Sequence, residues 1–153
     1  MMLGRLLRSA DFEAVLATAP RARSAHFAAH HLPRPPGGPK RHCKGVAPTI
    51  LSTGDTWGCP QTVDDITAPR APDRCWLGCV IPKRHARRAV ARNLLRRQIR
   101  AAARRCEAQL AHGLWLVRLR APFDAHHFRS AGSRALASAA RAELDGLLAR
   151  VTA

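Results

Sequence analysis

Ten Lys and Arg residues and no acidic residue occupy the segment from Lys83 to Arg105. The nearest acids are Asp73 before it and Glu107 after it. A solvated helix usually mixes charges of both signs, because opposite charges four positions apart stabilise it and like charges destabilise it. So dense a cationic run repels itself, and we expect it to be neutralised by a partner that carries many negative charges.

The apolar residues within and just after this run recur at helical spacing. They predict a long helix from about Ala86 to Ala111, closed by Gly113. Arg88, Arg92 and Arg96 step by four along one face of it. A buried stripe is predicted on a different face, formed by Ala91, Leu95, Ala102, Cys106 and Leu110.

The chemistry of the cationic face favours a nucleic acid over a lipid surface. Arginine binds phosphate oxygens through two parallel hydrogen bonds and also stacks on bases. A helix that lies on a membrane would carry large residues such as Trp or Phe opposite the charge, whereas this stripe is mostly Ala. The net charge of the whole chain, +16, is typical of a protein that binds nucleic acid. We therefore expect no membrane partner.

At 153 residues the chain has the length of a single domain. It has no run of ~18 apolar residues, so we expect no transmembrane segment. The N-terminal segment contains Arg and Ser, as mitochondrial transit peptides do, but such peptides avoid acids and Asp11 and Glu13 fall inside its predicted helix. Five cysteines without a secretory signal indicate reduced thiols, and we expect a cytoplasmic protein.

The remaining pattern predicts an α+β domain with a long insert. A helix is predicted from an N-cap at Ser9 to Pro20, and another from Ser130 or Ser133 to Val151. Strands are predicted over residues 24–32, 75–81 and 114–119. Residues 33–74 hold most of the prolines and show neither period, so we expect a largely unstructured insert that is either functional or tolerated at a loop tip.

Residues 77–100, LGCVIPKRHARRAVARNLLRRQIR, closely resemble the signature segment of the bacterial ribonuclease P protein subunit. In that family a strand containing Leu-Gly precedes basic residues and an Arg-Asn pair at fixed offsets. LLRSADFEAVL, SAHF, WLVRL and the closing helix resemble other parts of the family more weakly. The family's usual Arg after the Arg-Asn pair is replaced here by Leu94. The residues that match the signature are Lys83, Arg84, Arg87, Arg88, Arg92, Asn93, Arg96, Arg97 and Arg100.

The resemblance implies an α+β fold in which a mixed four-stranded sheet packs against helices. It also implies a left-handed βαβ crossover that displays the basic helix, against the strong right-handed preference of such units. The insert over 33–74 would interrupt this single domain. Members of the family are the small protein partner of a catalytic RNA that removes the 5′ leader from precursor tRNA, and the resemblance implies the same role here.

The resemblance also implies roles for individual residues. The nine signature residues are expected to bind the catalytic RNA, while Phe12 and Phe27 hold the leader in a cleft between the sheet and the first helix. Core packing is the alternative for each phenylalanine. Asn93 is expected to bond a base edge or a 2′-hydroxyl, or else to brace a neighbouring Arg. The chemistry is implied to belong to the RNA and the Mg²⁺ that it requires, so we expect no catalytic residue, cofactor or metal in the protein.

A basic ribosomal-type RNA-binding protein with no processing role is the main alternative function. A helix-turn-helix module is disfavoured, because it needs two short helices joined by a tight turn and the basic helix is flanked by predicted strands. We therefore expect no DNA partner. A zinc site among Cys43, Cys59, Cys75 and Cys79 is also disfavoured, because no CxxC pair occurs.

Overall fold

The structure is a computed structural model that describes residues 3–37, 73–124, 127–128 and 134–152. Most of the predicted insert, residues 38–72, lies outside these ranges. The helices within them are α1 (Ser9–Leu16), α2 (Ala89–Arg105), α3 (Arg134–Thr152) and a short 3-10 helix (Glu107–Gln109). The strands are β1 (Gly4–Arg5), β2 (Pro20–Arg23), β3 (Phe27–Leu32), β4 (Cys75–Val80) and β5 (Gly113–Leu119).

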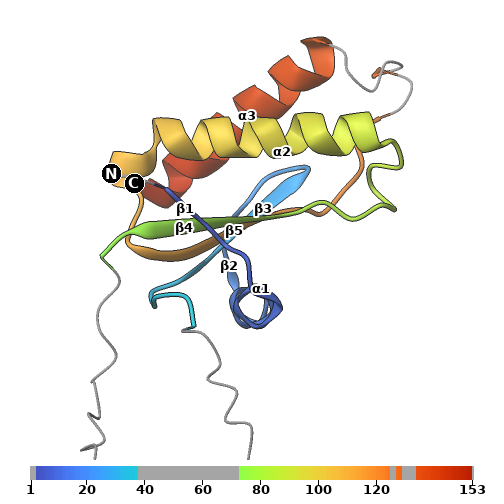
Figure 1. Cartoon of the computed structure of the whole chain (residues 1–153). Coiled ribbons are helices and arrows are strands. Elements are labelled where there is room, and N and C mark those ends of the chain that lie inside the picture. The colour runs from blue at the N-terminus through green and yellow to red at the C-terminus, as the bar shows by residue number, and fades with distance from the viewer. Residues whose placement is uncertain (1–2, 38–72, 125–126, 129–133, 153) are drawn as a thin grey trace, which may run out of the picture.

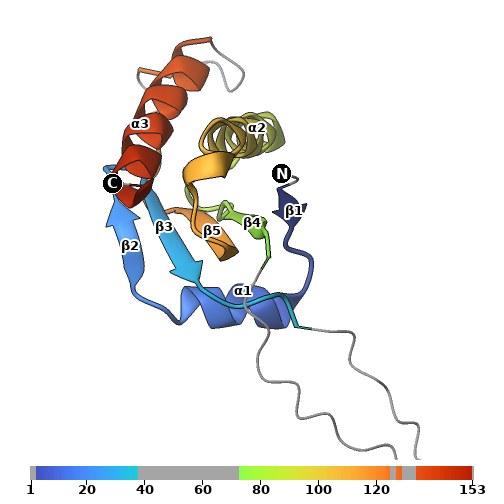
Figure 2. The same cartoon turned by 90° about the vertical axis from the view of Figure 1, so that its left-hand side faces the viewer.

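The strands form one mixed sheet in the order β1-β4-β5-β3-β2. β1, β4 and β5 are parallel, whereas β3 pairs antiparallel with both β5 and β2. α1 lies on one face of the sheet, and α2 and α3 lie on the other (Figure 1, Figure 2). The expected α+β fold with a mixed sheet is confirmed, although the described residues form five strands instead of four. β1 and β2 are too short and polar to give a strand period in the sequence.

The connection from β4 through α2 to β5 is the expected left-handed crossover. β4 and β5 are parallel neighbours from Cys75 opposite Gly113 to Val80 opposite Arg118. α2 runs back above them, and the two views together show the left-handed path (Figure 1, Figure 2). A right-handed connection between the same two strands would place α2 on the face that α1 covers. The hand of the crossover therefore decides which face of the sheet lies under the basic helix.

The sheet separates two apolar cores. β5 supplies both, because its successive side chains point to opposite faces. Leu114 and Leu116 pack toward α1 with Leu6 and Val15. The larger core lies toward α2 and α3 and includes Phe27, Leu77, Leu95, Ile99, Trp115, Val117, Leu144 and Leu147. Burial on both faces explains why the sequence of β5 is almost continuously apolar.

α2 is shorter than predicted, and its buried face is wider. It begins at Ala89, because residues 83–88 form a turn that Arg92 stabilises. The Nη1 of Arg92 donates to the carbonyl oxygens of Ala86 and Arg87 at 3.0 and 2.6 Å. The helical residues that are buried are Leu94, Leu95, Ile99, Ala102 and Ala103. The predicted stripe missed three of them, because a core-facing helix buries more than one row of residues four apart.

The residues predicted to cap α1 and α2 were wrong. α1 begins at Ser9, but its N-cap is Arg8, which makes no side-chain capping bond. Gly113 does not close α2 and is the first residue of β5. Its φ of 131° lies in the region that favours glycine, and a Cβ there would lie 2.5 Å from the carbonyl oxygen of Leu32.

The start of the insert is held against α1. Asp11, in the first turn of α1 as predicted, is only 2% exposed. Its carboxylate accepts hydrogen bonds from the backbone N–H of Gly37 at 3.0 Å and from Arg34 at 3.3 Å. The described residues 33–37 thus run beside α1, and the expectation of a structureless insert does not hold for them.

Glu143 on α3 anchors the turn between β2 and β3. One carboxylate oxygen accepts hydrogen bonds from Ser24 Oγ and the backbone N–H of His26, both at 2.6 Å. The other lies 2.8 Å from His26 Nδ1. Burial raises the pKa of Glu143, but the hydrogen bonds from Ser24 and His26 outweigh burial and leave the pKa below its ordinary value of 4.5.

Replacing Glu143 by Ala should lower the free energy of unfolding by about 1–3 kcal/mol at pH 7, because three donors lose a charged acceptor. A carboxyl whose pKa is lowered by folding stabilises the protein above its ordinary pKa, and this contribution disappears as the pH falls through the folded pKa. The deficit should therefore shrink below about pH 4.5. Urea denaturation at several pH values measures it, with the exposed Ser138→Ala on the same helix as the control. A deficit that is independent of pH would contradict this role.

Candidate nucleic-acid interface

The cationic surface of α2 is concentrated on the flank that faces β1. Arg96, Arg100 and Arg104 step by four along this flank. Arg96 and Arg100 border a hollow of about 440 Å³ at the edge of the sheet, beneath α2 and beside α1. We call this hollow the edge cleft, and it is lined by Arg5, Leu6, Phe12, Leu77, Gly78, Cys79, Asn93, Arg96 and Arg100. A smaller hollow lined by Arg5, Arg100 and Arg104 lies on the same flank.

The charge of the edge cleft comes from its guanidinium groups. Burial raises the pKa of Cys79 to about 11, and the nearby Arg100, Arg96 and Arg5 only partly oppose this rise. The thiol is therefore neutral at physiological pH. Arg105, on the other flank of α2, forms an ion pair with Asp145 of α3. Within the described residues no acid pairs with the arginines of the edge cleft, so their positive field remains available to a polyanion.

Phe12 supplies an aromatic surface to the edge cleft. The half-buried ring lies so close to β4 that a Cβ on Gly78 would be 2.7 Å from its Cε1 atom. The missing side chain at Gly78 thus gives the ring its place over the strand. Leu6 also packs beside Phe12 in the smaller core. The structure therefore brings Phe12 together with Arg96 and Arg100, which lie about 85 positions later in the sequence.

Phe27 does not lie in this cleft. Its side chain is 0% exposed and packs in the larger core on the opposite face of the sheet, with its ring 5.8 Å from that of Phe123. A ring with no exposed surface cannot stack on a base. The expectation that Phe27 holds a leader is therefore wrong, and the alternative of core packing is correct for it.

Asn93 braces a neighbouring arginine, which was one of the two roles expected for it. Its Oδ1 accepts a hydrogen bond from Arg96 Nη1 at 3.3 Å. Arg92 plays a different part from the rest of the signature, because it holds the turn before α2. Leu94, where the family usually has Arg, is 6% exposed and faces the larger core. The departure from the family pattern thus falls beneath the helix, away from the edge cleft.

The remaining signature residues lie elsewhere on the surface. Arg97 is exposed on α2. Lys83 is exposed in the turn before the helix. Arg84, Arg87 and Arg88 surround a separate pocket at the start of α2. The signature is continuous in sequence, but the fold places some of its residues at the edge cleft, some at this pocket and others at neither.

Several basic residues of this surface could not be predicted from the sequence. Arg5 reaches the edge cleft only because β1 pairs with β4 about 70 positions later. Arg104 lies outside the signature segment. Arg23, Arg118 and Arg120 line another hollow, of about 290 Å³. Alternation along β5 places Arg118 on the same face of the sheet as Leu116 and α1.

The residues that the structure describes provide neither a site for a metal ion nor a membrane-spanning helix. These contain no group of three or more His, Cys, Asp or Glu side chains placed to hold a metal ion. Cys75 and Cys79 are free thiols, and Cys43 and Cys59 lie outside the described ranges. None of the described helices combines the length and apolar character needed to cross a bilayer.

Comparisons with known proteins point to one family. The family model for ribonuclease P matches residues 3–143. The ribonuclease P protein component of Paraburkholderia xenovorans (strain LB400) is 31% identical over 144 residues, which cover 94% of this chain and 77% of the relative. That of Burkholderia pseudomallei (strain 1106a) is 45% identical over 74 residues, 48% of this chain and 54% of the relative. The chain thus spans about half the length of the latter protein in the matched region.

A solved structure shares the fold. The RNase P protein of Staphylococcus aureus superposes with a TM-score of 0.55, and the alignment covers 99% of this chain and 100% of that one. The two sequences are 16% identical, so this likeness bears on the fold alone.

Replacing Arg96 or Arg100 by Ala should weaken binding to structured RNA and flatten its salt dependence. Each arginine–phosphate contact contributes about 0.7 to 0.9 to the slope of log K against log salt concentration, so each substitution should lower the slope by up to about one. Titrations at several salt concentrations measure this. Arg105→Ala removes the same charge from the flank that pairs with Asp145, and should change the slope less. Unchanged slopes in both edge-cleft variants would place the nucleic acid elsewhere.

Proposed function

Because this chain belongs to the ribonuclease P protein family, we propose that it is the protein subunit of a ribonuclease P. In this role it binds the catalytic RNA and the 5′ leader of precursor tRNA, and assists the endonucleolytic removal of the leader during tRNA maturation. The cleavage chemistry belongs to the RNA and its Mg²⁺. The protein contributes no catalytic residue and no cofactor.

The observation that carries this proposal is the composition of the edge cleft. It combines an aromatic ring, Phe12, with the guanidinium groups of Arg5, Arg96 and Arg100 in one hollow. Proteins hold single-stranded nucleic acid by stacking bases on aromatic side chains beside a positively charged groove that follows the backbone. A single-stranded leader therefore matches the cleft better than a duplex, whose bases are already stacked on one another.

Two further arginines, one near the end of β5 and one just after it, extend the proposed binding surface for the leader. Arg118 and Arg120 lie beside β2 and β3 in the neighbouring hollow, and Arg118 is on the face that α1 partly covers. A strand whose bases stack at Phe12 could place its next phosphates near these arginines. We therefore assign to Phe12 alone the leader-binding role that was expected of both Phe12 and Phe27.

The exposed arginines of α2 suit the second partner, the catalytic RNA. They neutralise phosphates, which strengthens association and lowers the repulsion within a compactly folded RNA, and they do so without reading its sequence. Arg97, exposed on the helix, is placed for such a contact. A ribosomal-type RNA-binding protein would share this feature, but it would have no need for a cleft that accepts a single strand.

Replacing Phe12 by Leu should selectively weaken the binding of precursor tRNA to the holoenzyme reconstituted with its RNA subunit. Leu preserves the apolar packing near Leu6 and removes the ring face, so we expect a loss of about fivefold or more, the lower end of the ~1–3 kcal/mol typical of one stacked base. Binding of mature tRNA, which lacks the leader, should be nearly unchanged. Leu7→Ala, at a side chain that is 76% exposed, is the control.

Assays of the wild-type protein distinguish the two candidate functions, a ribonuclease P subunit and a ribosomal-type RNA-binding protein. A ribonuclease P subunit should increase cleavage of precursor tRNA by the RNA at low Mg²⁺, and the holoenzyme should bind precursor tRNA more tightly than mature tRNA. Equal binding of both, with no gain in cleavage, would leave only a basic RNA-binding domain.

A further inference from the structure

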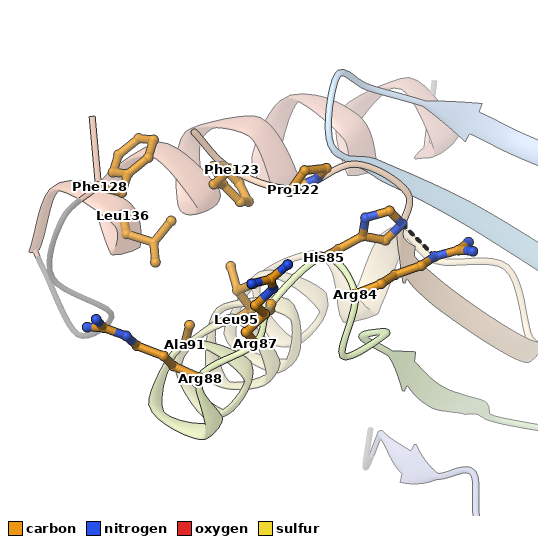
Figure 3. Close-up of a pocket in the computed structure, with 11 residues that line it drawn as sticks. Arg84, His85, Arg87, Arg88, Ala91, Leu95, Pro122, Phe123, Phe128 and Leu136 are labelled. Atoms are coloured by element: carbon orange, nitrogen blue, oxygen red, sulfur yellow. Dashed lines mark hydrogen bonds between the residues drawn. The ribbon is translucent and has the colours of Figure 1, made fainter. Parts of the chain in front are cut away.

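A second hollow, distinct from the edge cleft, lies at the start of α2. It has a volume of about 470 Å³, within the range of about 300–1,000 Å³ usual for small-molecule sites. It opens between the turn before α2 and the residues that follow β5 (Figure 3). None of its lining residues borders the edge cleft. We call it the aromatic pocket, after Phe123 and Phe128.

The walls of the aromatic pocket are apolar and held in place. Phe123 stacks on His26 with ring centroids 4.0 Å apart and an interplanar angle of 11°. Phe128 meets Phe123 edge-on at 5.7 Å. Both phenylalanines are half-buried, whereas Leu95 and Leu136 are 1% and 4% exposed and anchor the pocket in the larger core. The rings are therefore positioned before any ligand arrives, which lowers the ordering cost of binding.

The rim of the aromatic pocket is cationic. Arg84, Arg87 and Arg88 are exposed, and no acid is found among the described residues that line the pocket. None of the three forms an ion pair with an acid in the described part of the chain. The carbonyl oxygen of Arg87 accepts a hydrogen bond from Arg92, so the backbone of the rim is fixed to α2. Figure 3 shows Arg87, Arg88 and Ala91 across the pocket from Phe128 and Leu136.

We propose that the aromatic pocket receives one unpaired base of the catalytic RNA, with the adjoining phosphates bound by Arg87 and Arg88. The flat apolar face of a base matches phenylalanine walls, and its charged backbone matches an arginine rim. Proteins commonly recognise folded RNA through such bases, which are splayed out of loops and bulges onto aromatic or arginine surfaces. Phosphate binding alone would require the arginines but would not require an apolar pocket behind them.

The catalytic RNA is the source of the base because Arg88 directly precedes the helix proposed to bind that RNA. The inference rests on the proposed function for the identity of the RNA. It adds a contact of a different kind, since the pocket would select RNA with an unpaired nucleotide at one position. The arginines of α2 neutralise phosphates at any sequence. An apolar side chain of a protein partner would match the walls but leave the cationic rim without counter-charge.

Filling the pocket tests the inference. Ala91 borders it from the half-exposed side of α2, so Ala91→Leu should occupy the space and exclude the base while keeping all arginines. Phe128→Leu does not fill the pocket but removes one of its aromatic rings, and it keeps the side chain apolar. Ala101→Leu makes the same change on the same helix, at a half-exposed residue that borders neither the aromatic pocket nor the edge cleft, and is the matched control.

Binding to the catalytic RNA should weaken about fivefold or more in Ala91→Leu and Phe128→Leu, and should be unchanged in Ala101→Leu. The salt slope should stay at the wild-type value in Ala91→Leu, but decrease in Arg87→Ala and Arg88→Ala, because only the latter variants lose phosphate contacts. Chemical probing of the RNA should reveal one unpaired base that the wild-type protein protects and Ala91→Leu exposes. Thermal unfolding checks that each variant is folded. If Ala91→Leu does not fold, Phe128→Leu provides the test of the pocket.

Wild-type affinity and an unchanged protection pattern in the folded variants would overturn the inference. If the wild-type protein still increased cleavage of precursor tRNA, the proposed function would stand without it. Failure of the wild-type protein to bind the catalytic RNA would overturn both.

Discussion

The parallel pairing of β4 with β5 determines where the charged side chains of α2 lie. A helix that connects two adjacent parallel strands must cross one face of the sheet, and the left-handed path selects the face that α3 also covers (Figure 2). One flank of α2 consequently packs toward α3, where Arg105 meets Asp145. The opposite flank faces β1 and keeps its arginines at the edge of the sheet. Gly78 of β4 lies beneath Phe12, and this close approach gives the edge cleft its aromatic wall.

This arrangement lets a strongly cationic helix remain folded. Like charges one turn apart destabilise a helix by only about 0.2–0.5 kcal/mol per pair, whereas full burial of a Leu or Ile side chain contributes about 1.5–3 kcal/mol. Leu95 and Ile99, each 1% exposed, therefore outweigh several repulsive pairs among the arginines. The helix therefore presents its charge without a bound partner, and the proposed binding of RNA phosphates would relieve the remaining repulsion.

The edge cleft and the aromatic pocket combine the same two kinds of side chain at two separate places beside α2. In each, aromatic rings are held by the fold: Phe12 by the absence of a side chain at Gly78, and Phe123 by its stack on His26. In each, arginines from α2 or its preceding turn border the rings. Under the proposed function, the two sites would hold two segments of RNA at once in a fixed relative position. Such positioning would assist the cleavage that the proposed function assigns to the RNA.

Much of the fold could be predicted because it depends on local patterns. The helical period over α2, the apolar runs of β4 and β5 and the final helix are visible in consecutive residues, and so is the signature from Leu77 to Arg100. The boundaries were less accurate, since the turn before α2 is stabilised by a side chain of the helix itself. β1 and β2 could not be found at all, because their few residues become strands only through pairing with β4 and β3.

The sequence by itself determined that this protein would concentrate positive charge on one helix beside an apolar sheet, because charge and periodicity are properties of neighbouring residues. Only the tertiary structure decided which residues share a site. Phe12 and Phe27 look equivalent in the sequence, yet one lines a cleft and the other is sealed in the core. Arg5 and Arg100 line the same cleft, and Phe123 and Arg87 line the same pocket. In each pair the residues lie too far apart in the sequence for a local pattern to link them. The exposure of a side chain depends on which elements cover its face of the sheet, and that is settled by strand pairing and the hand of the crossover.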